Sequence, residues 1–288
     1  MSDDGQFGFS IIALIGTVFS PYYAFSGRHD PHNHVALNVG LYGKGIRRWT
    51  MTERGRNSLS QTPTQLQIGP SALEWHNGTL VVTIDERGAP LPQRVRGTIR
   101  LTPQGITAAN YQLDFKGRHF WHPIAPSARA QIDFEFPKTR WSGDAYFDSN
   151  WGSEPLEAGF SYWDWSRAVL ADGAGIYYDA VTKDGGKQRL ALLFDKAGSV
   201  QEIDCPEPAP MAPGPIWRVA RSAPAARGED IQTLAMLEDT PFYTRSKISI
   251  PFNGHQATAI HESLDLDRFS KTWVRCLLTF RMPRNTFG

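Results

Sequence analysis

The sequence predicts an all-β fold, and three features support that prediction. Apolar and polar residues alternate with a period of two in many short segments, whereas long apolar stripes with the helical period are absent. Turn signals separate these segments, at Asn77-Gly78, Asp184-Gly185-Gly186 and Asn253-Gly254. Short strands at this spacing are typical of β barrels and β sandwiches.

The first expected strand is the apolar run Ile11–Phe19. We interpret it as a buried strand because the preceding MSDDGQ is acidic, unlike the start of a signal peptide, and because the run is too short to span a bilayer. Nothing else approaches a transmembrane length, so any membrane contact is expected to be peripheral. The Pro/Ala-rich segment Cys205–Ala226 is expected to be a loop. The remaining expected strands are Leu80–Ile84, Val95–Leu101, Ala130–Phe136, Gly175–Val181, Arg189–Phe194, Ile231–Leu237, Lys247–Ile250, Thr258–Leu266 and Thr272–Phe280.

Length and composition describe a folded globular protein. A chain of 288 residues forms one large β domain or two of ordinary size. The net charge of +1 gives no general reason to expect nucleic acid as a partner. The two cysteines, Cys205 and Cys276, have no metal-binding spacing, so a reducing compartment is expected. Nine Trp and sixteen Phe fit either a large apolar or unsaturated ligand or a well-filled β core.

Three histidines in the motif RHDPHNH, namely His29, His32 and His34, raise the question of a metal site, which Asp30 would extend. Pro31 interrupts the run, and no helix brings two of the histidines together at the usual spacing. We therefore expect a structural loop in which one histidine faces a pocket, and no bound metal.

Two further polar segments are interpreted as solvated. In Thr50–Arg56, a turn-like segment, Glu53 is expected to pair with Arg54 or Arg56. If His261–Asp267 is a strand, alternation places polar side chains on one face, which is usually the wet side of a sheet. These side chains are His261, Ser263, Asp265 and Asp267. Motifs for a serine hydrolase, a dinucleotide site or a phosphate loop are absent from the sequence.

The most informative stretch is GDAYFDSNWGSEPLEAGFSYWDW, from Gly143 to Trp165, which mixes many aromatic residues with acids. Within it Tyr146 and Asp148 share one face of an extended segment, as His119 and Trp121 do earlier in the chain. If both faces line one cavity, they bring together an imidazole, an indole, a phenol and a carboxylic acid. The alternative is an aromatic core with Asp148 capping a turn, and spacing alone does not separate the two.

Four segments together resemble one known family, the carotenoid 1,2-hydratases of purple photosynthetic bacteria, also called hydroxyneurosporene synthases. They are SPYYAFSGRHDPHNHVALNVGLYG, RWTMTERGR, IGPSALEW and RWSGDAYFDSNWGSEPLEAGFSYWDWSRA. The resemblance extends over nearly the whole chain, and the long last motif is specific. It is weakest in the Pro/Ala-rich segment after Cys205.

The resemblance implies two tandem lipocalin-like β-barrel or sandwich domains, which we place at 1–138 and 139–288, with a ligand pocket near their junction. It also implies cofactor-independent addition of water across the terminal C1–C2 double bond of acyclic carotenoids. Neurosporene, lycopene and their 1-hydroxy derivatives are the family's substrates, on routes to spheroidene and spirilloxanthin. A non-catalytic lipocalin-like carrier and a related cyclase or isomerase are the alternatives.

Within the family motif, Asp148 is the implied proton donor, and His119, Trp121 and Tyr146 match the other implicated positions. A free Asp, with a pKa of about 3.9, is ionised near neutral pH, so burial among Tyr146, Trp151 and other aromatics must raise the pKa of Asp148. His119, or Asp148 once it is ionised, would accept the proton from the attacking water.

The remaining aromatics of the stretch are assigned to substrate binding, whereas its other acids suit ion pairs or turns. The substrate-binding residues are Trp151, Trp163, Trp165 and Phe147. The acids set aside are Glu154, Glu157 and Asp164. Because carotenoids reside in lipid, we expect peripheral association with the cytoplasmic side of the photosynthetic membrane, through Ile11–Phe19 or exposed tryptophans.

Overall fold

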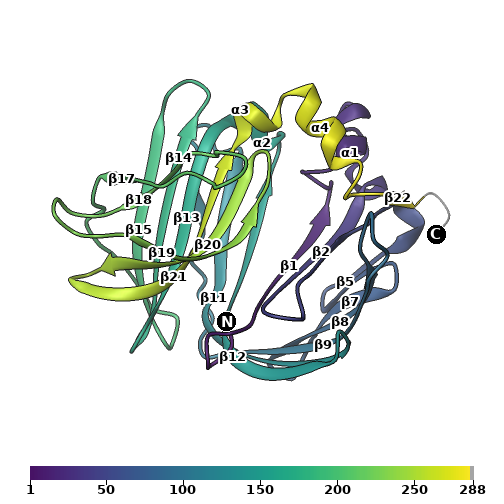
Figure 1. The fold of residues 1–288 in the computed structure, drawn as a ribbon, viewed down its shortest axis with the longest axis horizontal. Helices are drawn as coiled ribbons and strands as arrows, with labels where there is room; N and C mark the ends of the chain where they lie inside the picture. The colour runs from purple at the N-terminus through teal and green to yellow at the C-terminus, as the bar shows by residue number, and fades with distance from the viewer. Residues whose placement is uncertain (286–288) are drawn as a thin grey trace. The chain divides into compact units, whose positions relative to one another are not determined.

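The structure, a computed structural model, describes residues 1–285 and consists mainly of antiparallel β strands (Figure 1). The all-β class predicted from the sequence is confirmed. No helix within 1–285 is both long and apolar enough to cross a membrane. The helices are α1 (Pro21–Phe25), α2 (Leu156–Gly159), α3 (Leu266–Phe269) and α4 (Thr272–Leu278), with single 3-10 turns at η1 (Pro31–Asn33) and η2 (Arg56–Ser58).

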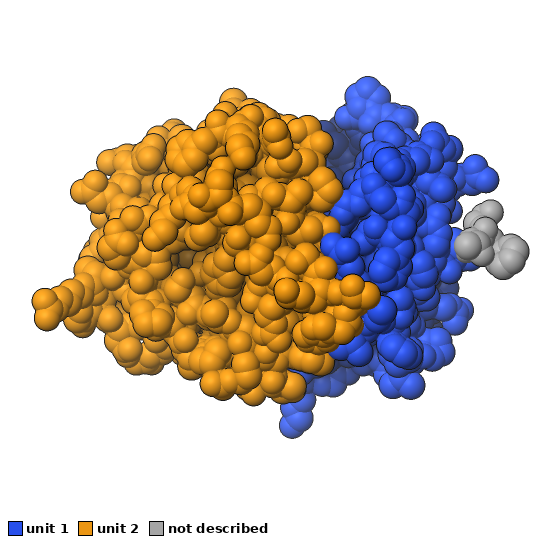
Figure 2. Space-filling model, turned by 90° about the horizontal axis from the view of Figure 1, so that it is seen from above, with its two compact units in different colours: residues 1–103, 128–145, 275–288 blue, residues 104–127, 146–274 orange. Residues whose placement is uncertain are grey.

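The chain divides into two compact units, coloured separately in Figure 2. Unit 1 contains residues 1–103, 128–145 and 275–288, and unit 2 contains residues 104–127 and 146–274. The expected division into 1–138 and 139–288 has one boundary, whereas each of these units is assembled from separate segments. The difference arises because β11 (His119–Phe136) and β12 (Thr139–Gly152) each begin in one unit and end in the other.

Two sheets contain the strands of the N-terminal part of the chain. The first has five strands, in the order β1 (Gly8–Ile15), β2 (Val35–Tyr42), β4 (Glu53–Arg54) and β22 (Arg284–Asn285), with β3 (Arg48–Met51) paired to β2. The second has eight, in the order β10 (Tyr111–Gln112), β11, β9 (Arg94–Pro103), β8 (Thr79–Arg87), β7 (Ser71–His76), β6 (Gln65–Ile68) and β5 (Leu59–Thr62), with β12 paired to β11. The expected strand Ile11–Phe19 is therefore β1, which ends at Ile15 and is only partly buried.

Alternation and turn chemistry set the register of these strands. In β8, Leu80, Val82 and Ile84 point to the buried side. Asn77 and Gly78 both have positive φ, 48° and 75°, as a tight two-residue hairpin turn requires. The pairing Trp75↔Leu80 across this turn then fixes which face of β7 and β8 is buried.

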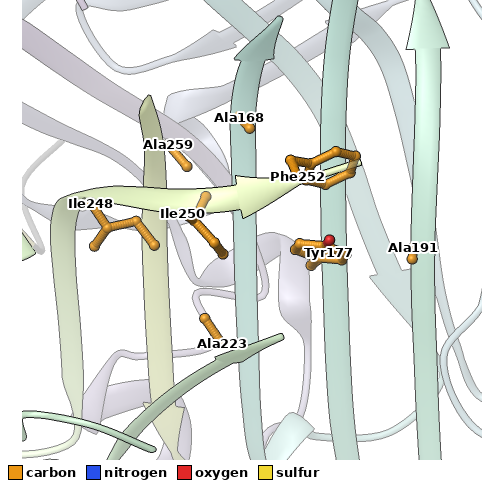
Figure 3. Close-up of a cluster of buried hydrophobic side chains, with 8 residues drawn as sticks. All are labelled: Ala168, Tyr177, Ala191, Ala223, Ile248, Ile250, Phe252 and Ala259. Carbon is orange, nitrogen blue, oxygen red and sulfur yellow. The ribbon is translucent and has the colours of Figure 1, made fainter. Parts of the chain in front are cut away.

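Unit 2 is organised around a seven-stranded antiparallel sheet. Its order is β16 (Val200–Glu202), β15 (Lys187–Asp195), β14 (Gly173–Thr182), β13 (Phe160–Leu170), β21 (His255–Asp265), β20 (Tyr243–Phe252) and β19 (Gln232–Asp239). Side chains from this sheet and from β18 (Arg221–Pro224) form the apolar cluster of Figure 3. Its members are Ala168, Tyr177, Ala191, Ala223, Ile248, Ile250, Phe252 and Ala259.

The segment Cys205–Ala226, expected to be a loop, contains a two-stranded sheet of β17 (Pro208–Met211) and β18. Proline lacks the N–H that a central strand needs, but both strands of a two-stranded sheet are edges, so prolines are tolerated there. The prolines mark edge strands here, so the prediction of a loop is wrong for Pro208–Met211 and Arg221–Pro224 and holds for the rest of the segment.

The predicted strand Thr272–Phe280 is also wrong, because the chain forms α4 there. Val274 and Leu278, four residues apart, are buried on one side of the helix. The run TWVRCLLTF is apolar on more than one side, so its periodicity does not distinguish a strand from a short helix.

The segment Thr50–Arg56 is not a solvated turn. Glu53 is 1% exposed, and its Oε1 lies 2.8 Å from Nδ1 of His34 and also accepts from Arg284. Arg54 is buried as well, and its Nη2 donates to Oε2 of Glu86 at 2.7 Å. Both predicted partners of Glu53 are therefore wrong. Since buried charges require partners, these two ion pairs belong to the core of unit 1.

Candidate active site

Three of the predicted site residues meet inside unit 2. Trp121 lies on β11. Tyr146 and Asp148 lie two residues apart on β12, so their side chains point to the same face of that strand. The indole N–H of Trp121 donates to the Tyr146 hydroxyl and to Oδ2 of Asp148, at 3.0 Å in each case. Asn150 Nδ2 also donates to Oδ2 of Asp148, at 3.3 Å. The carboxyl group is held by an indole, a phenol and an amide.

An aromatic wall surrounds this group. The ring centres of Trp165 and Tyr146 lie 5.3 Å apart, as do those of Tyr178 and Trp121. Trp163 contacts Tyr178 edge-on at 6.0 Å. Trp163 and Trp165, both assigned to substrate binding from the sequence, alternate to the same face of β13.

The aromatic surroundings change the acidity of Asp148. Burial is the main cause, and it raises the pKa of this carboxyl from 3.8 to about 6. Hydrogen bonds from Trp121 and Tyr146 oppose the rise by favouring the carboxylate, while the charge of Glu262 adds to it. Burial also raises the pKa of Tyr146 well above its usual value, so the phenol stays neutral. Just below neutral pH, a substantial fraction of the molecules therefore carries Asp148 as the protonated, neutral acid.

His119 shares a face of β11 with Trp121 but lies in a separate pocket of its own. Its side chain is 2% exposed and packs on Phe160, with ring centres 4.7 Å apart. A Cβ added at Gly152 or Gly159 would come within 2.7 Å of the imidazole nitrogens, so both positions must be glycine to accommodate the ring. Rings connect this pocket to the Asp148 group, because Phe160 contacts Trp163 at 5.7 Å and Trp163 contacts Tyr178.

The imidazole of His119 is buried beside a carboxylate. Nε2 is buried without a hydrogen-bond partner among the described residues, and Oε1 of Glu154 lies 3.5 Å from it. Burial lowers the pKa of His119 below 6.5, which keeps the ring neutral near neutral pH. Arg118 donates to Oε2 of Glu154 at 2.6 Å and so fixes this carboxylate. Glu154, set aside in the sequence as an ion-pairing residue, does form an ion pair and also lies beside His119.

Two of the predicted substrate-binding residues lie elsewhere. Trp151 is 48% exposed and stacks on Phe120, with ring centres 5.7 Å apart. Phe120 alternates to the opposite face of β11 from Trp121, so Trp151 does not form part of the wall around Asp148. Phe147 likewise alternates to the face of β12 opposite Tyr146. The placement of both residues differs from the prediction because alternation separates neighbours in a strand.

The sequence reasoning missed three residues of this site. Tyr178 and Phe160 complete the aromatic wall, and Glu262 lies directly across from Trp165 in the β13–β21 pairing. Arg245 Nε donates to Oε1 of Glu262 at 2.7 Å, which holds the carboxylate. Tyr178 pairs with Trp165 across β13 and β14. This pairing would have identified Tyr178, but the register of two strands cannot be determined from the sequence.

A second buried polar group occupies the opposite face of β13. Asp164 accepts from Ser222 Oγ at 2.6 Å, from Ser263 Oγ at 2.5 Å and from the Tyr162 hydroxyl at 3.1 Å. Burial raises the pKa of Asp164 to about 7. His261 is 1% exposed and, like Ser263, is buried, so the prediction of a wet face for this part of β21 was wrong. The β17–β18 hairpin covers these polar groups, since Ser222 belongs to β18.

The arrangement around Asp148 suits proton transfer to a very weak base. It supplies an acid near neutral pH and aromatic faces that stabilise a developing cation, each worth about 0.5–2 kcal/mol. In residues 1–285, no group of three His, Cys, Asp or Glu side chains is placed to hold a metal ion.

Comparison with known proteins identifies related sequences over almost the whole chain. Residues 11–287 match the family described as carotenoid hydratase CrtC. The acyclic carotenoid 1,2-hydratase of Thiocapsa roseopersicina is 48% identical over 287 residues, which cover 99% of this chain and 71% of that protein. The enzyme of the same name from Cereibacter sphaeroides is 41% identical, covering 95% of this chain and 98% of that one.

A solved structure shows the same fold at low sequence identity. The crystal structure of a Nitrosomonas europaea protein described as AttH superposes with a TM-score of 0.61 at 16% identity, covering 92% of this chain and 89% of that one. This similarity confirms the expected lipocalin-like β fold, and at such identity it bears on the fold alone.

Proposed function

The chain belongs to the carotenoid hydratase family, and on that premise we propose that it adds water across the terminal C1–C2 double bond of an acyclic carotenoid without a cofactor. The observation that supports this proposal best is the carboxyl of Asp148, whose pKa is raised to about 6 inside a group of aromatic rings. An unactivated alkene is a very weak base, so hydration requires a neutral acid in a water-poor setting. Neurosporene, lycopene and their 1-hydroxy derivatives are the proposed substrates, on routes to spheroidene and spirilloxanthin.

The proposed reaction begins with proton transfer from the carboxyl of Asp148 to C2. The π electrons of the double bond form the new C–H bond, which leaves a tertiary cation at C1 and a carboxylate on Asp148. Trp121, Tyr146 and Trp165 present ring faces or edges near this carboxyl, and aromatic faces stabilise a desolvated cation. These rings also offer no strong nucleophile that would compete with water.

Water then attacks C1 and forms the C–O bond, and its excess proton moves to a base. The imidazole of His119 is one acceptor, because burial keeps the ring neutral and the carboxylate of Glu154, 3.5 Å from its Nε2, would stabilise the protonated form. The carboxylate of Asp148 is the other, and proton return to it would close the catalytic cycle directly. In either case the product is a tertiary alcohol and the net change is the addition of one water.

The test is to incubate the purified protein with lycopene in detergent micelles and measure product mass. Hydration adds the mass of one water, whereas a carrier returns lycopene unchanged and a cyclase or isomerase gives a product of unchanged mass. Asp148→Asn keeps the shape of the side chain but removes the acid, and we expect at least a hundredfold loss of turnover.

Asp144→Asn is the matched control for this variant. Asp144 lies on the same strand, but its side chain is 45% exposed and faces Arg129 in unit 1. We expect this control to retain wild-type turnover. Near-full turnover in Asp148→Asn, with normal folding, would remove Asp148 from the proton-donor role.

Because carotenoids reside in lipid, we also propose that the enzyme works in peripheral contact with the cytoplasmic side of the photosynthetic membrane. Flotation of the protein with lipid vesicles measures this association, and a protein that stays entirely in the soluble fraction would contradict it.

A further inference from the structure

The helix α4 is apolar on two neighbouring sides, one buried and one exposed. Val274 and Leu278 face the interior and are 0% and 7% exposed. Trp273 and Leu277, also four residues apart, are 48% and 40% exposed, and Phe280 in the following turn is 70% exposed. Trp273 and Leu277 therefore share one helix face, and Phe280 follows three residues after Leu277 in the turn that ends the helix. We call Trp273, Leu277 and Phe280 the α4 patch.

The remaining side of α4 carries Thr272, Arg275 and Cys276, so the helix is amphipathic, with an apolar surface wider than the part that is buried. The buried side of α4 is explained by packing, but the α4 patch is left facing solvent. Trp217 stacks on Trp273 with ring centres 6.3 Å apart, which holds the indole in place. Its chain neighbour Ile216 is 75% exposed and adds to the apolar surface. A large exposed cluster of this kind marks an interaction surface.

The charge around α4 indicates the partner. Residues 268–283 contain four basic residues and no acidic residue, which gives this segment a net charge of +4; Arg284, which follows, is paired with the buried Glu53. Lys271, at the start of the segment, is exposed next to the helix. Arg268 donates to a backbone carbonyl, that of Trp217, so its positive charge is not neutralised there. A tryptophan, a leucine and a phenylalanine beside basic side chains match the composition of segments that lie in the interface of anionic membranes.

We propose that the α4 patch docks this protein on an anionic lipid surface. The aromatic and leucine side chains enter the boundary between headgroups and acyl chains, while the basic residues contact lipid phosphates. This inference deepens the proposed function, because it gives the enzyme a fixed contact with the lipid in which a carotenoid dissolves. Lipid binding is nevertheless measured without turnover, so the two proposals fail separately.

The experiment compares three proteins, namely wild type, a Trp273→Ser/Leu277→Ser/Phe280→Ser variant, and a control with Phe115→Ser and Ile106→Ser. The control residues are 72% and 54% exposed and lie away from α4 in the sequence. Each protein is floated with vesicles of phosphatidylcholine alone and with vesicles containing phosphatidylglycerol. Circular dichroism and thermal unfolding check that all three are folded.

We expect wild type and control to bind the phosphatidylglycerol vesicles, with binding that weakens at high salt. The α4 variant should bind them at least tenfold more weakly, and pure phosphatidylcholine should bind wild type less than the anionic vesicles do. Equal binding by the α4 variant and wild type would overturn the proposal, as would equal losses in the variant and the control. Absence of wild-type binding to both kinds of vesicle would also overturn it.

Two further readouts distinguish the remaining explanations. Cys276 is exposed on α4 and can carry an environment-sensitive fluorophore in a Cys205→Ser background. The emission maximum of this fluorophore should shift to shorter wavelength when anionic vesicles are added. If instead the α4 variant changes the oligomeric state of the free protein and no vesicle shift occurs, the patch is a self-association surface and the proposal is wrong. The α4 variant should convert lycopene normally in detergent, whereas absence of conversion by wild type there would contradict the proposed function alone.

Discussion

Replacing Trp121 with Phe should make Asp148 a weaker acid and extend activity to higher pH. The indole N–H donates to Oδ2 of Asp148 at 3.0 Å and stabilises the carboxylate, so it lowers the pKa of Asp148. Phe keeps an apolar ring but has no N–H. Removal of a donor that favours the charged form must raise the pKa of the acid.

The size of the shift follows from the geometry. A hydrogen bond to a charged group contributes about 1.5–3 kcal/mol, and one pKa unit corresponds to about 1.4 kcal/mol. The N–H is shared equally with Tyr146, at 3.0 Å to each acceptor, so about half of this energy reaches Asp148. We therefore expect the pKa of Asp148 to rise by about half a unit to one unit from its value of about 6.

The assay is the pH dependence of kcat/KM for lycopene in detergent micelles, since this parameter reports ionisations of the free enzyme. The variant should be slower throughout because it has lost an indole. Its rate relative to wild type should nevertheless rise about three- to tenfold between pH 5 and pH 8, because a shift of about half a unit to one unit enlarges the protonated fraction by that factor at high pH.

Trp151→Phe is the matched control, because Trp151 stacks on Phe120 and is not a donor to Asp148. We expect its pH profile to coincide with that of wild type. The alkaline limb of the pH profile is the fall of kcat/KM at high pH. If this limb stays in place or moves to lower pH in Trp121→Phe, Asp148 is not the acid whose ionisation it reports.

Three other changes test separate parts of the structure. Tyr146→Phe removes a second hydrogen bond that favours the Asp148 carboxylate, so the alkaline limb of kcat/KM should again move to higher pH; an unchanged midpoint would contradict the assigned contact. Glu154→Gln removes a charge that raises the pKa of His119, so the acidic limb should move to lower pH if His119 is the base, and a fixed limb would exclude that role. Asp164 is buried with its pKa raised from 3.8 to about 7, so the folded state loses stability as pH rises across that interval. Denaturant unfolding of Asp164→Asn should show a smaller decrease in the free energy of unfolding between pH 4 and pH 7, and an unchanged slope would show that Asp164 does not titrate there.

Much of the fold could be predicted because strands leave a local signature. The expected strands Leu80–Ile84, Val95–Leu101 and Ala130–Phe136 lie within β8, β9 and β11. Their alternation reflects the pleat of the strand itself, in which successive side chains point to opposite faces. Turn residues are equally local, and Asn77-Gly78 adopts the positive φ angles that a tight hairpin requires.

The errors fall where long-range packing decides the outcome. Glu53 and His261 looked solvated in the sequence because each lies in a polar segment, yet both are buried among partners from distant segments. Two of the polar partners of Asp164, Ser222 and Ser263, come from β18 and β21, up to 99 residues away. Whether a polar face is wet depends on what covers it, and no local pattern contains that information.

For the candidate site, the sequence by itself determined which side chains share a face. Alternation along a strand places Tyr146 beside Asp148, and His119 on the same side as Trp121, whatever the rest of the chain does. The resemblance in the central motif likewise singled out Asp148 as the acid. These features depend only on neighbouring residues.

Only the tertiary structure decided which side chains come into contact. It brought the indole of Trp121 to a carboxyl 27 residues away, enclosed His119 between two glycines, and left Trp151 outside the aromatic wall. The acidity of Asp148 follows from that enclosure, because its pKa is raised by the loss of water around the carboxyl. Strand register and burial are properties of the packed chain, since each depends on segments that are far apart in sequence.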